Sequence, residues 1–389
     1  MNLLFDLPPN YKVVREGKEN GENWIFRIKT CLDREITAVA VTQPTVSRTG
    51  PTWSYVFENN GLNTVDVGSP GSFDSLKDGY KAAGITLTDI QTCFVSHGHA
   101  DHDGTIPEFI SGSKSDLYAH ESYGFLKSFK SWDIQDFTST VLQREFTKIV
   151  DTKVDKKDLN QKIDSSAEYY KKKQEINVTV GLKHRDVFGD IEVYSTPGHS
   201  PDQICLAIDD VVFTGDHVLP EITPHPTTKM NFKKSFINRI SKEAVELEAL
   251  YGLKVYLESL GYILHSNEGR TLLPAHRLYN RSTLNIIDTE RARAIIDHHS
   301  LRLARLLRNV ISNSSSLEDL TKGLFSKGEL SGANMVAALS EVVAHLEFLE
   351  DVGDIVVTED GIISVPPSAK PNYKSVIDHI LKGSNGVIR

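Results

Sequence analysis

One short segment constrains this chain more than any other, because it concentrates metal-binding side chains at the end of a predicted strand. His97, His99, Asp101 and His102 lie within six residues, where the apolar run 92–97 ends. Imidazole and carboxylate groups are ligands of divalent transition metals such as zinc, iron and manganese. Two histidines at positions i and i+2 of a strand end can both turn inward, and Asp101 and His102 then face a neighbouring position. The spacing therefore predicts two adjacent metal sites.

Further candidate ligands come at the ends of three later predicted strands. His199 ends the segment TPGH, Asp216 ends FTGD and His276 ends LPAH. The small residue before each ligand lets the backbone approach a crowded metal centre. One such unit is weak evidence, because a glycine followed by a histidine is common. The three units together, in one chain order, indicate a centre built from several strand ends.

The composition excludes several classes of function. The net charge of -9 argues against a bulk nucleic-acid or membrane-surface binder. Cys31, Cys93 and Cys205 form no close pair, which excludes a cysteine-based zinc site and a disulfide framework. No run of 18 apolar residues occurs, and the first residues lack the basic and apolar regions of a secretory signal. We therefore expect no membrane span and a cytoplasmic location.

The pattern of elements predicts two domains. Residues 1–285 begin with β-rich runs and carry the candidate ligands, and their mixed-charge stretch 121–180 predicts a helical insertion that caps the site and holds no core element. Residues 286–389 predict three helices and then two short strands around Asp360-Gly361, which is a winged-helix pattern. Aromatic residues in the insertion favour either a partly apolar organic substrate or simple packing: Phe125, Phe129, Trp132, Phe137, Tyr169 and Tyr170.

These motifs resemble those of the metallo-β-lactamase superfamily. HGHADH at 97–102 is similar to its HxHxDH motif, and TPGHS, TGD and PAH are similar to its later histidine, bridging-aspartate and final-histidine motifs. VDVG at 65–68 is similar to the early strand-ending aspartate motif. The resemblance runs from about residue 50 to 280. It implies the α+β class, as an αββα sandwich of two mixed sheets with helices outside and the metals at one edge.

The resemblance also assigns roles to the candidate residues. It implies that His97, His99 and His199 hold one metal, that Asp101, His102 and His276 hold a second, and that Asp216 bridges them. Two divalent ions are expected, zinc first, with iron or manganese as alternatives.

Three further residues are open to two interpretations. Asp66 either orients a ligand histidine by a hydrogen bond or caps a loop. His225, in a proline-rich loop just past Asp216, is a substrate-contact candidate near the mouth of the site. We interpret His217 as a structural residue, because it points away from Asp216 if the strand continues.

The predicted function is a dinuclear metal-dependent hydrolase of a small organic ester, thioester or lactone. A hydroxide shared by two cations is a nucleophile at neutral pH. Asp101 is the predicted catalytic residue, because it can orient the hydroxide or relay a proton to the leaving group.

Two alternatives remain. The tail resembles that of the branch containing the β-lactamase-like-2 endoribonuclease, which implies a ribonuclease or phosphodiesterase. An all-histidine and aspartate ligand set also permits an iron-dependent redox enzyme. The first tail helix gathers arginines, Arg291, Arg293, Arg302, Arg305 and Arg308.

The third tail helix would enter DNA, but it carries Glu341, Glu347, Glu350 and Asp351 without lysine or arginine. Nucleic acid is therefore the less favoured partner. We expect the tail to pack on the sandwich, shape the pocket or form a homodimer.

Overall fold

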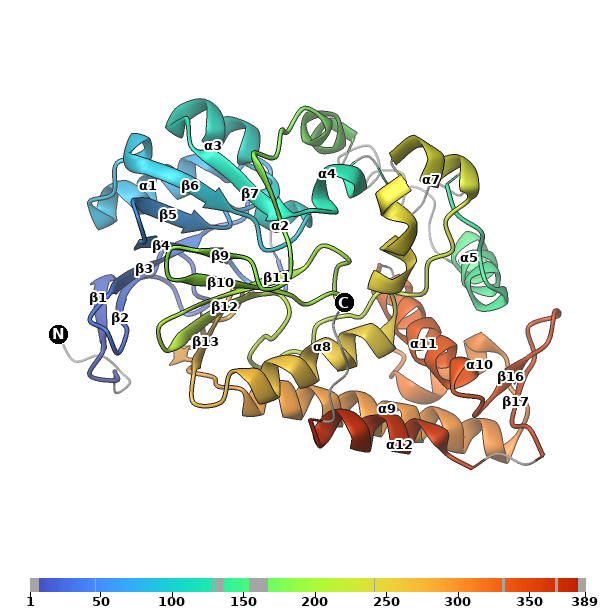
Figure 1. Ribbon diagram of the computed structural model, residues 1–389. Coiled ribbons are helices and arrows are strands. Elements are labelled where there is room, and N and C mark those ends of the chain that lie inside the picture. The colour runs from blue at the N-terminus through green and yellow to red at the C-terminus, as the bar shows by residue number, and fades with distance from the viewer. Residues whose placement is uncertain are drawn as a thin grey trace.

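Two β-sheets face one another at the centre of the molecule (Figure 1). The computed structural model describes residues 7–45, 47–127, 129, 136–153, 167–240, 242–330, 333–367 and 370–383. Trp132, one of the aromatic residues of the predicted insertion, lies outside these ranges. Apolar side chains of both sheets, such as Phe57 and Phe213, stack between them. Hydrophobic burial between the sheets therefore holds the two layers together.

The first sheet has its strands in chain order, antiparallel up to β5 and parallel from β5 to β8. Its strands are β1 (Tyr11–Arg15), β2 (Ile25–Lys29), β3 (Glu35–Val41), β4 (Thr52–Glu58), β5 (Leu62–Val65), β6 (Ile90–Phe94), β7 (Asp116–His120) and β8 (Val180–Leu182). Its outer face packs against α1 (Phe73–Ala83) and α3 (Ile106–Ser113) through one apolar cluster. The short α2 (Ala100–Asp103) and the 3-10 turn η1 (Leu87–Asp89) lie in the loops of this half.

The second sheet has the order β13-β12-β11-β10-β9, and only its β12–β13 pair is parallel. Its strands are β9 (Val187–Phe188), β10 (Ile191–Ser195), β11 (Ile204–Ile208), β12 (Val211–Gly215) and β13 (Thr271–Pro274). Helix α8 (Leu253–Ser266) covers its outer face (Figure 1). The helix–sheet–sheet–helix layering agrees with the expected sandwich.

The chain after β13 forms a hairpin, three helices, a second hairpin and a last helix. The predicted order of three helices followed by a hairpin is present within this series. These elements are β14 (Tyr279–Asn280), β15 (Thr283–Leu284), α9 (Glu290–Ser312), α10 (Leu317–Leu324), α11 (Ala333–Asp351), β16 (Val356–Val357), β17 (Ile363–Ser364) and α12 (Asn372–Leu381). Helix α9 buries Ile295, His299, Leu303 and Leu306, a spacing of three and four residues that places one face on the core. That face packs on α8, so the tail and the second sheet's outer helix share one apolar cluster.

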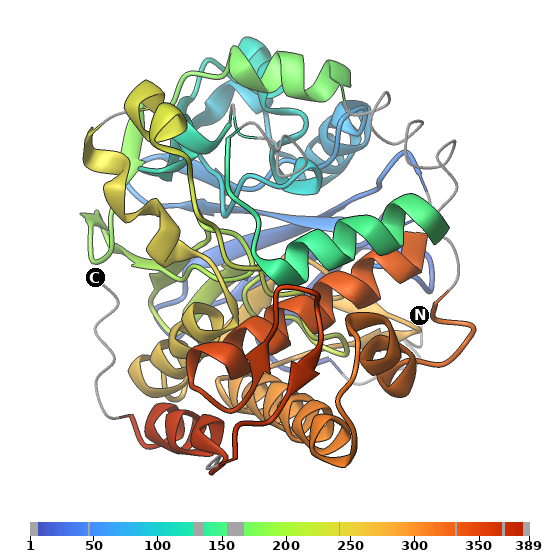
Figure 2. The same cartoon turned by 90° about the vertical axis from the view of Figure 1, so that its right-hand side faces the viewer.

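The insertion is partly described and contributes to this same cluster. Its helices are α4 (Tyr123–Leu126), α5 (Val141–Lys153) and a helical stretch at 167–174. Helix α5 lies along α11 (Figure 2) and buries Leu142, Ile149 and Val150 in the shared cluster. The expectation that the insertion holds no core element is therefore wrong for α5, because its apolar face packs against the tail.

A smaller apolar cluster joins the insertion to the segment before α8. Phe129 packs there with Met230, Phe232, Phe236 and Leu247. The segment contains α7 (Lys234–Ile240) and the 3-10 helix η2 (Lys242–Leu250). In the described part of the chain, no helix is both long enough and apolar enough to cross a membrane.

Candidate metal centre

All the predicted ligands lie in segments that directly follow strands of the two sheets, at one edge of the sandwich. His97 and His99 follow β6 of the first sheet, and α2, which begins directly after His99, carries Asp101 and His102. The second sheet supplies the remaining three from the loop after β10 and the ends of β12 and β13: His199, Asp216 and His276. Because the strands of both sheets end at this edge, residues far apart in sequence converge on one centre.

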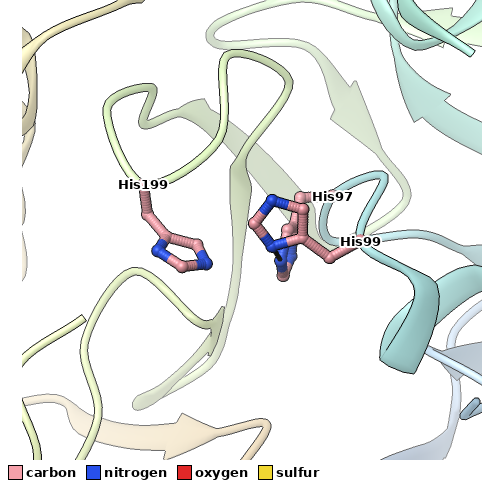
Figure 3. Close-up of side chains that lie close together, drawn as sticks. All are labelled: His97, His99 and His199. Atoms are coloured by element: carbon pink, nitrogen blue, oxygen red, sulfur yellow. Dashed lines mark hydrogen bonds between the residues drawn. The ribbon is translucent and has the colours of Figure 1, made fainter. Parts of the chain in front are cut away.

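The first group, called site one, consists of His97, His99 and His199. One nitrogen of each ring lies within 4.8 Å of the others. Nε2 of His97 is 2.9 Å from Nδ1 of His99, and the ring of His199 approaches from the opposite loop (Figure 3). Three imidazole nitrogens at this separation match the donor set of a transition-metal site.

The second group, called site two, consists of Asp101, His102 and His276. Nε2 of His276 is 3.2 Å from Oδ2 of Asp101, and Nε2 of His102 is 3.7 Å from Oδ1. Asp216 faces both groups: Oδ1 lies 3.5 Å from His102 Nε2 and Oδ2 lies 3.7 Å from His199 Nε2. This position between the two groups is the one expected of a bridging carboxylate.

Several inward-facing atoms of the centre have no hydrogen-bond partner among the described residues. They are Nε2 of His102, His199 and His276 and Oδ1 of Asp216, all buried. A buried polar atom left unpaired costs about 1–3 kcal/mol. Ligation of two cations would satisfy all four atoms at once, so the donor set fits a dinuclear metal centre.

The electrostatics favour positive charge in site two and neutral imidazoles in site one. Burial lowers the pKa of His102, but the carboxylates of Asp216, Asp66 and Asp101 outweigh it and raise that pKa well above its ordinary value. Burial, together with His102 and the other neighbouring imidazoles, holds the pKa of His97 well below its ordinary value. Site one is therefore made of uncharged nitrogen donors, and site two is a position where carboxylates stabilise a cation.

The candidate ligands are oriented by further hydrogen bonds. Oδ2 of Asp66 accepts from His102 Nδ1 at 2.8 Å, so the predicted contact between Asp66 and a candidate ligand is present. Nδ1 of His276 donates to the Pro51 carbonyl at 3.0 Å. Partners of this kind set the tautomer and ring orientation of a ligand histidine.

His225 contacts the centre through its backbone. Its carbonyl oxygen accepts a hydrogen bond from Nδ1 of His199 at 2.9 Å. Its ring turns toward α11, where Nε2 lies 3.1 Å from the Ala337 carbonyl oxygen and 3.7 Å from Oε2 of Glu341. The prediction placed His225 near the site, and the structure brings its carbonyl there.

The remaining buried histidines near the centre have packing or hydrogen-bonding surroundings. His217 is buried with its ring edge-to-face against Tyr256 at 5.4 Å. His120 lies between the hydroxyl groups of Ser122, at 2.7 Å, and Ser195, at 3.0 Å. These positions agree with structural roles for both.

Sequence reasoning missed a polar group that lies beside the HGHADHDG loop. Asp103 is buried and ion-paired with Lys173, and Asp202 accepts a hydrogen bond from the Gly98 amide. Asp103 directly follows the recognised motif and Asp202 follows His199 by three residues, so their places in the chain offered a signal. Lys173 carries no such signal, because it lies in a mixed-charge helix with several other lysines.

A separate cluster of His299, Glu341 and His345 lies between α9 and α11. Its members are joined by ion pairs and hydrogen bonds, although Nε2 of His299 has no hydrogen-bond partner among the described residues. Arg302 forms an ion pair with Glu341, His299 Nδ1 is 3.0 Å from His345 Nε2, and His345 Nδ1 donates to the Glu341 carbonyl at 2.7 Å. Burial lowers the pKa of His345 to about 4 despite the nearby Glu341. The cluster is therefore a buried polar network that joins two tail helices.

The comparisons with known proteins agree with this geometry. A metallo-beta-lactamase family protein from Thermus thermophilus is 18% identical, with a TM-score of 0.60 over 85% of this chain and 98% of that one. A beta-lactamase domain protein from Burkholderia ambifaria is 19% identical, also with a TM-score of 0.60, over 85% of this chain and 91% of that one. No curated protein matches the chain.

The two solved structures establish the shared fold. The sequence model of one family, described as the Metallo-beta-lactamase superfamily, matches residues 47–287, which is more than half of the chain. All seven predicted ligands lie within that range. The chain therefore belongs to the metallo-beta-lactamase superfamily.

Proposed function

We propose that this protein is a dinuclear metal-dependent hydrolase that cleaves an ester, thioester or lactone of a small organic molecule. Superfamily membership and the clustered histidine and aspartate side chains support a metal-dependent hydrolase. The observation that carries the dinuclear form is the set of buried ligand atoms around Asp216 that have no hydrogen-bond partner in the described part of the chain. Zinc is the proposed metal, because imidazole nitrogens and carboxylate oxygens are the ligands of many catalytic zinc sites.

The candidate ligands are not equally accessible. His99 is exposed and the Asp101 side chain is 31% exposed, whereas His97, His102 and His276 are fully buried. A substrate would therefore approach from the side of His99 and Asp101. When bound, two divalent cations would supply a water-derived nucleophile at neutral pH and stabilise developing negative charge.

Asp101 is placed to move a proton. Its Oδ2 contacts Nε2 of His276 at 3.2 Å, while part of the carboxylate faces solvent. Burial raises the pKa of Asp101, but the nearby charges of His102 and His276 outweigh burial and hold that pKa well below its ordinary value. We assign Asp101 the task of orienting the attacking water and passing its proton to the leaving group.

Apolar residues linked to the loop that carries His199 support a partly apolar substrate. The Thr227 hydroxyl donates to the Gly198 carbonyl at 2.9 Å and accepts from the Gly252 amide. Gly252 directly follows Tyr251, which packs on the apolar cluster of Phe129 and Phe232. Apolar side chains linked in this way to the His199 loop would suit a small organic ligand, because sites for such ligands combine apolar surface with a few polar groups.

The contacts of the tail arginines favour a small-molecule substrate over an RNA substrate. Arg291 donates to the carbonyls of Leu219 and Ile222, and Arg302 pairs with Glu341. Arg293 pairs with Glu290 on its own helix. Three of the five arginines thus contact groups of the protein itself. Few arginines are then left to form a phosphate-binding strip. We propose that α9, α10, α11 and the β16–β17 hairpin form a winged helix whose role is to support the sandwich.

The cellular compartment is also part of the proposal. The three cysteines are free thiols, and two of them are buried. Free thiols persist in reducing compartments. We propose the cytoplasm as the location.

The test combines metal analysis with a substrate panel. Protein expressed in minimal medium with one added metal at a time is expected to hold two zinc ions per chain. It is expected to cleave members of a panel of aryl esters, thioesters and lactones, with loss of cleavage in Asp101→Asn and His102→Ala. Cleavage of labelled single-stranded RNA without ester cleavage would establish the phosphodiesterase alternative. One iron per chain with oxygen uptake would establish the redox alternative.

A further inference from the structure

A buried lysine connects the insertion to the metal-binding loop. Lys173, in the helical stretch 167–174, has a side chain that is 6% exposed, and its Nζ lies 2.8 Å from Oδ2 of the fully buried Asp103. Nζ also donates to the Gly98 carbonyl and lies 3.0 Å from the Tyr169 hydroxyl. A buried ammonium is costly unless it is paired and hydrogen-bonded, and here all its partners come from the loop and the insertion.

Asp103 is the centre of this contact. Tyr123 donates to its Oδ2 at 2.8 Å and Tyr169 donates to its Oδ1 at 2.6 Å. Burial, together with the charge of Asp103, raises the pKa of both hydroxyl groups well above the ordinary value, so both remain protonated donors. The carboxylate is therefore fully satisfied, and it ties α4 and the 167–174 stretch to α2.

The peptide groups on both sides of Gly98 are held by opposite charges. The Gly98 amide donates to Oδ2 of Asp202 at 3.0 Å, and the Gly98 carbonyl accepts from Lys173. A Cβ atom at this position would lie 2.8 Å from Asp202 Oδ2 and 3.0 Å from Lys173 Nζ. A side chain at position 98 would therefore have to displace the ends of both side chains from these contacts, and this glycine separates His97 from His99.

We propose that Lys173 is a positioning residue for site one: by holding the Gly98 carbonyl, it sets the separation and orientation of the His97 and His99 rings. The insertion would thereby be part of the metal site's support. The proposal rests on the metal binding in the proposed function and not on the hydrolysis. Because linkage is reciprocal, a metal in site one is in turn expected to stabilise the docking of 167–174.

The first experiment compares Lys173→Met with Lys172→Met. The two lysines are neighbours on one helical stretch, but Lys172 is 45% exposed and pairs with Glu108 at the surface. Zinc affinity is measured by chelator competition on the full chain, with no substrate present. Loss of the partner that orients a metal ligand typically lowers metal affinity 10- to 100-fold. Lys173→Met is expected to weaken one of the two sites by about that factor, and Lys172→Met is expected to match the wild type.

A double variant separates positioning from charge balance. Lys173→Met alone leaves the buried Asp103 charge without its partner and can destabilise the fold, whereas Lys173→Met with Asp103→Asn removes both charges. The double variant is expected to recover thermal stability but to keep the weakened zinc site. Recovery of wild-type zinc affinity in the double variant would overturn the proposal, because Lys173 would then only balance Asp103.

Hydrogen exchange supplies a second readout. Zinc is expected to slow amide exchange in residues 167–174 of the wild type and of Lys172→Met, and to have no effect there in the double variant. Equal protection in all three would contradict the proposed coupling. Absence of zinc binding in the wild type would overturn this proposal and the proposed function together. Zinc binding without hydrolysis of any substrate would overturn the proposed function alone.

Discussion

Nδ1 of His102 lies 2.8 Å from Oδ2 of Asp66, and neither side chain is exposed to solvent. Asp66 adopts a left-handed backbone conformation with φ of 57°, and it also accepts from the amide and the hydroxyl group of Ser96. Asp66 thus holds a candidate metal ligand and the residue before His97 at the same time.

Asp66→Asn is expected to lower zinc affinity at site two by about 10- to 100-fold. The amide cannot accept from all three donors, so His102 loses the bond that orients its ring. Chelator competition measures the affinity. Asp33→Asn is the matched control, because Asp33 is exposed and has a similar φ of 62°. Equal zinc affinity in Asp66→Asn and Asp33→Asn would contradict the assignment.

Gly198→Ala is expected to destabilise the protein by about 3 kcal/mol. Gly198 has φ of +126°, and a Cβ atom there would lie 2.3 Å from the Cα atom of Tyr256, which is backbone and cannot rotate away. Gly124→Ala is the control, since no atom lies within 4 Å of its Cβ position. Urea unfolding of both variants measures the difference. A Gly198→Ala variant as stable as Gly124→Ala would show that the His199 loop is not constrained as described.

Replacement of single candidate ligands is expected to change the metal count. His276→Ala removes a buried donor of site two, so the zinc content is expected to fall from two ions to one per chain. His379→Ala replaces an exposed histidine on α12 and is expected to keep two. Elemental analysis after dialysis gives the count. Two ions in His276→Ala would exclude His276 from the ligand set.

Removal of both metals is expected to destabilise the folded state. A ligand that binds only the folded chain stabilises it by about 2.7 kcal/mol at 100 times its dissociation constant. The chelated protein is therefore expected to melt at a lower temperature, and added zinc is expected to reverse the change. A melting temperature that does not respond to zinc would contradict a metal site in the folded protein.

Glu347 is expected to make stability depend on pH. It is buried on α11 and accepts from Thr140, Gln143 and the Lys229 amide. Burial outweighs these hydrogen bonds and raises the pKa of Glu347 from 4.5 to about 7. The folded state therefore binds this proton more tightly than the unfolded state. Its stabilising effect is complete below about pH 4.5 and is lost as the pH rises through about 7.

The corresponding variant is Glu347→Gln, which keeps the shape without the charge. The shift corresponds to about 3 kcal/mol at most, at 1.36 kcal/mol per pH unit. Urea unfolding at pH 5 and pH 8 is expected to show a larger loss of stability in the wild type than in Glu347→Gln. The same loss in both proteins would place the pH dependence elsewhere.

The candidate ligands could be predicted from sequence because each one is local to a strand end. An apolar run, a small residue and a histidine or aspartate are neighbours in the chain, so the pattern is visible without the fold. Lys173 could not be found in this way. Its partner Gly98 is 75 residues away, and a lysine in a mixed-charge helix is normally a surface residue.

Two other features could not be predicted from the sequence. His225 contacts His199 through a carbonyl oxygen, and every residue has a carbonyl, so no residue type marks that role. The packing of α5 on α11 depends on which apolar faces meet. A periodic pattern shows that a helix has such a face, but it does not show what covers the face.

The apolar cluster shared by α8, α9, α11 and α5 has a consequence for fragments of this protein. A polypeptide ending at residue 285 would lack α9, α11 and α12, which pack on α8, and would leave part of the apolar surface of α8 in water. Contiguous exposed apolar surface causes aggregation. The segment that matches the family model is therefore not expected to fold stably without the tail. Heat is expected to unfold the sandwich and the tail in a single cooperative transition.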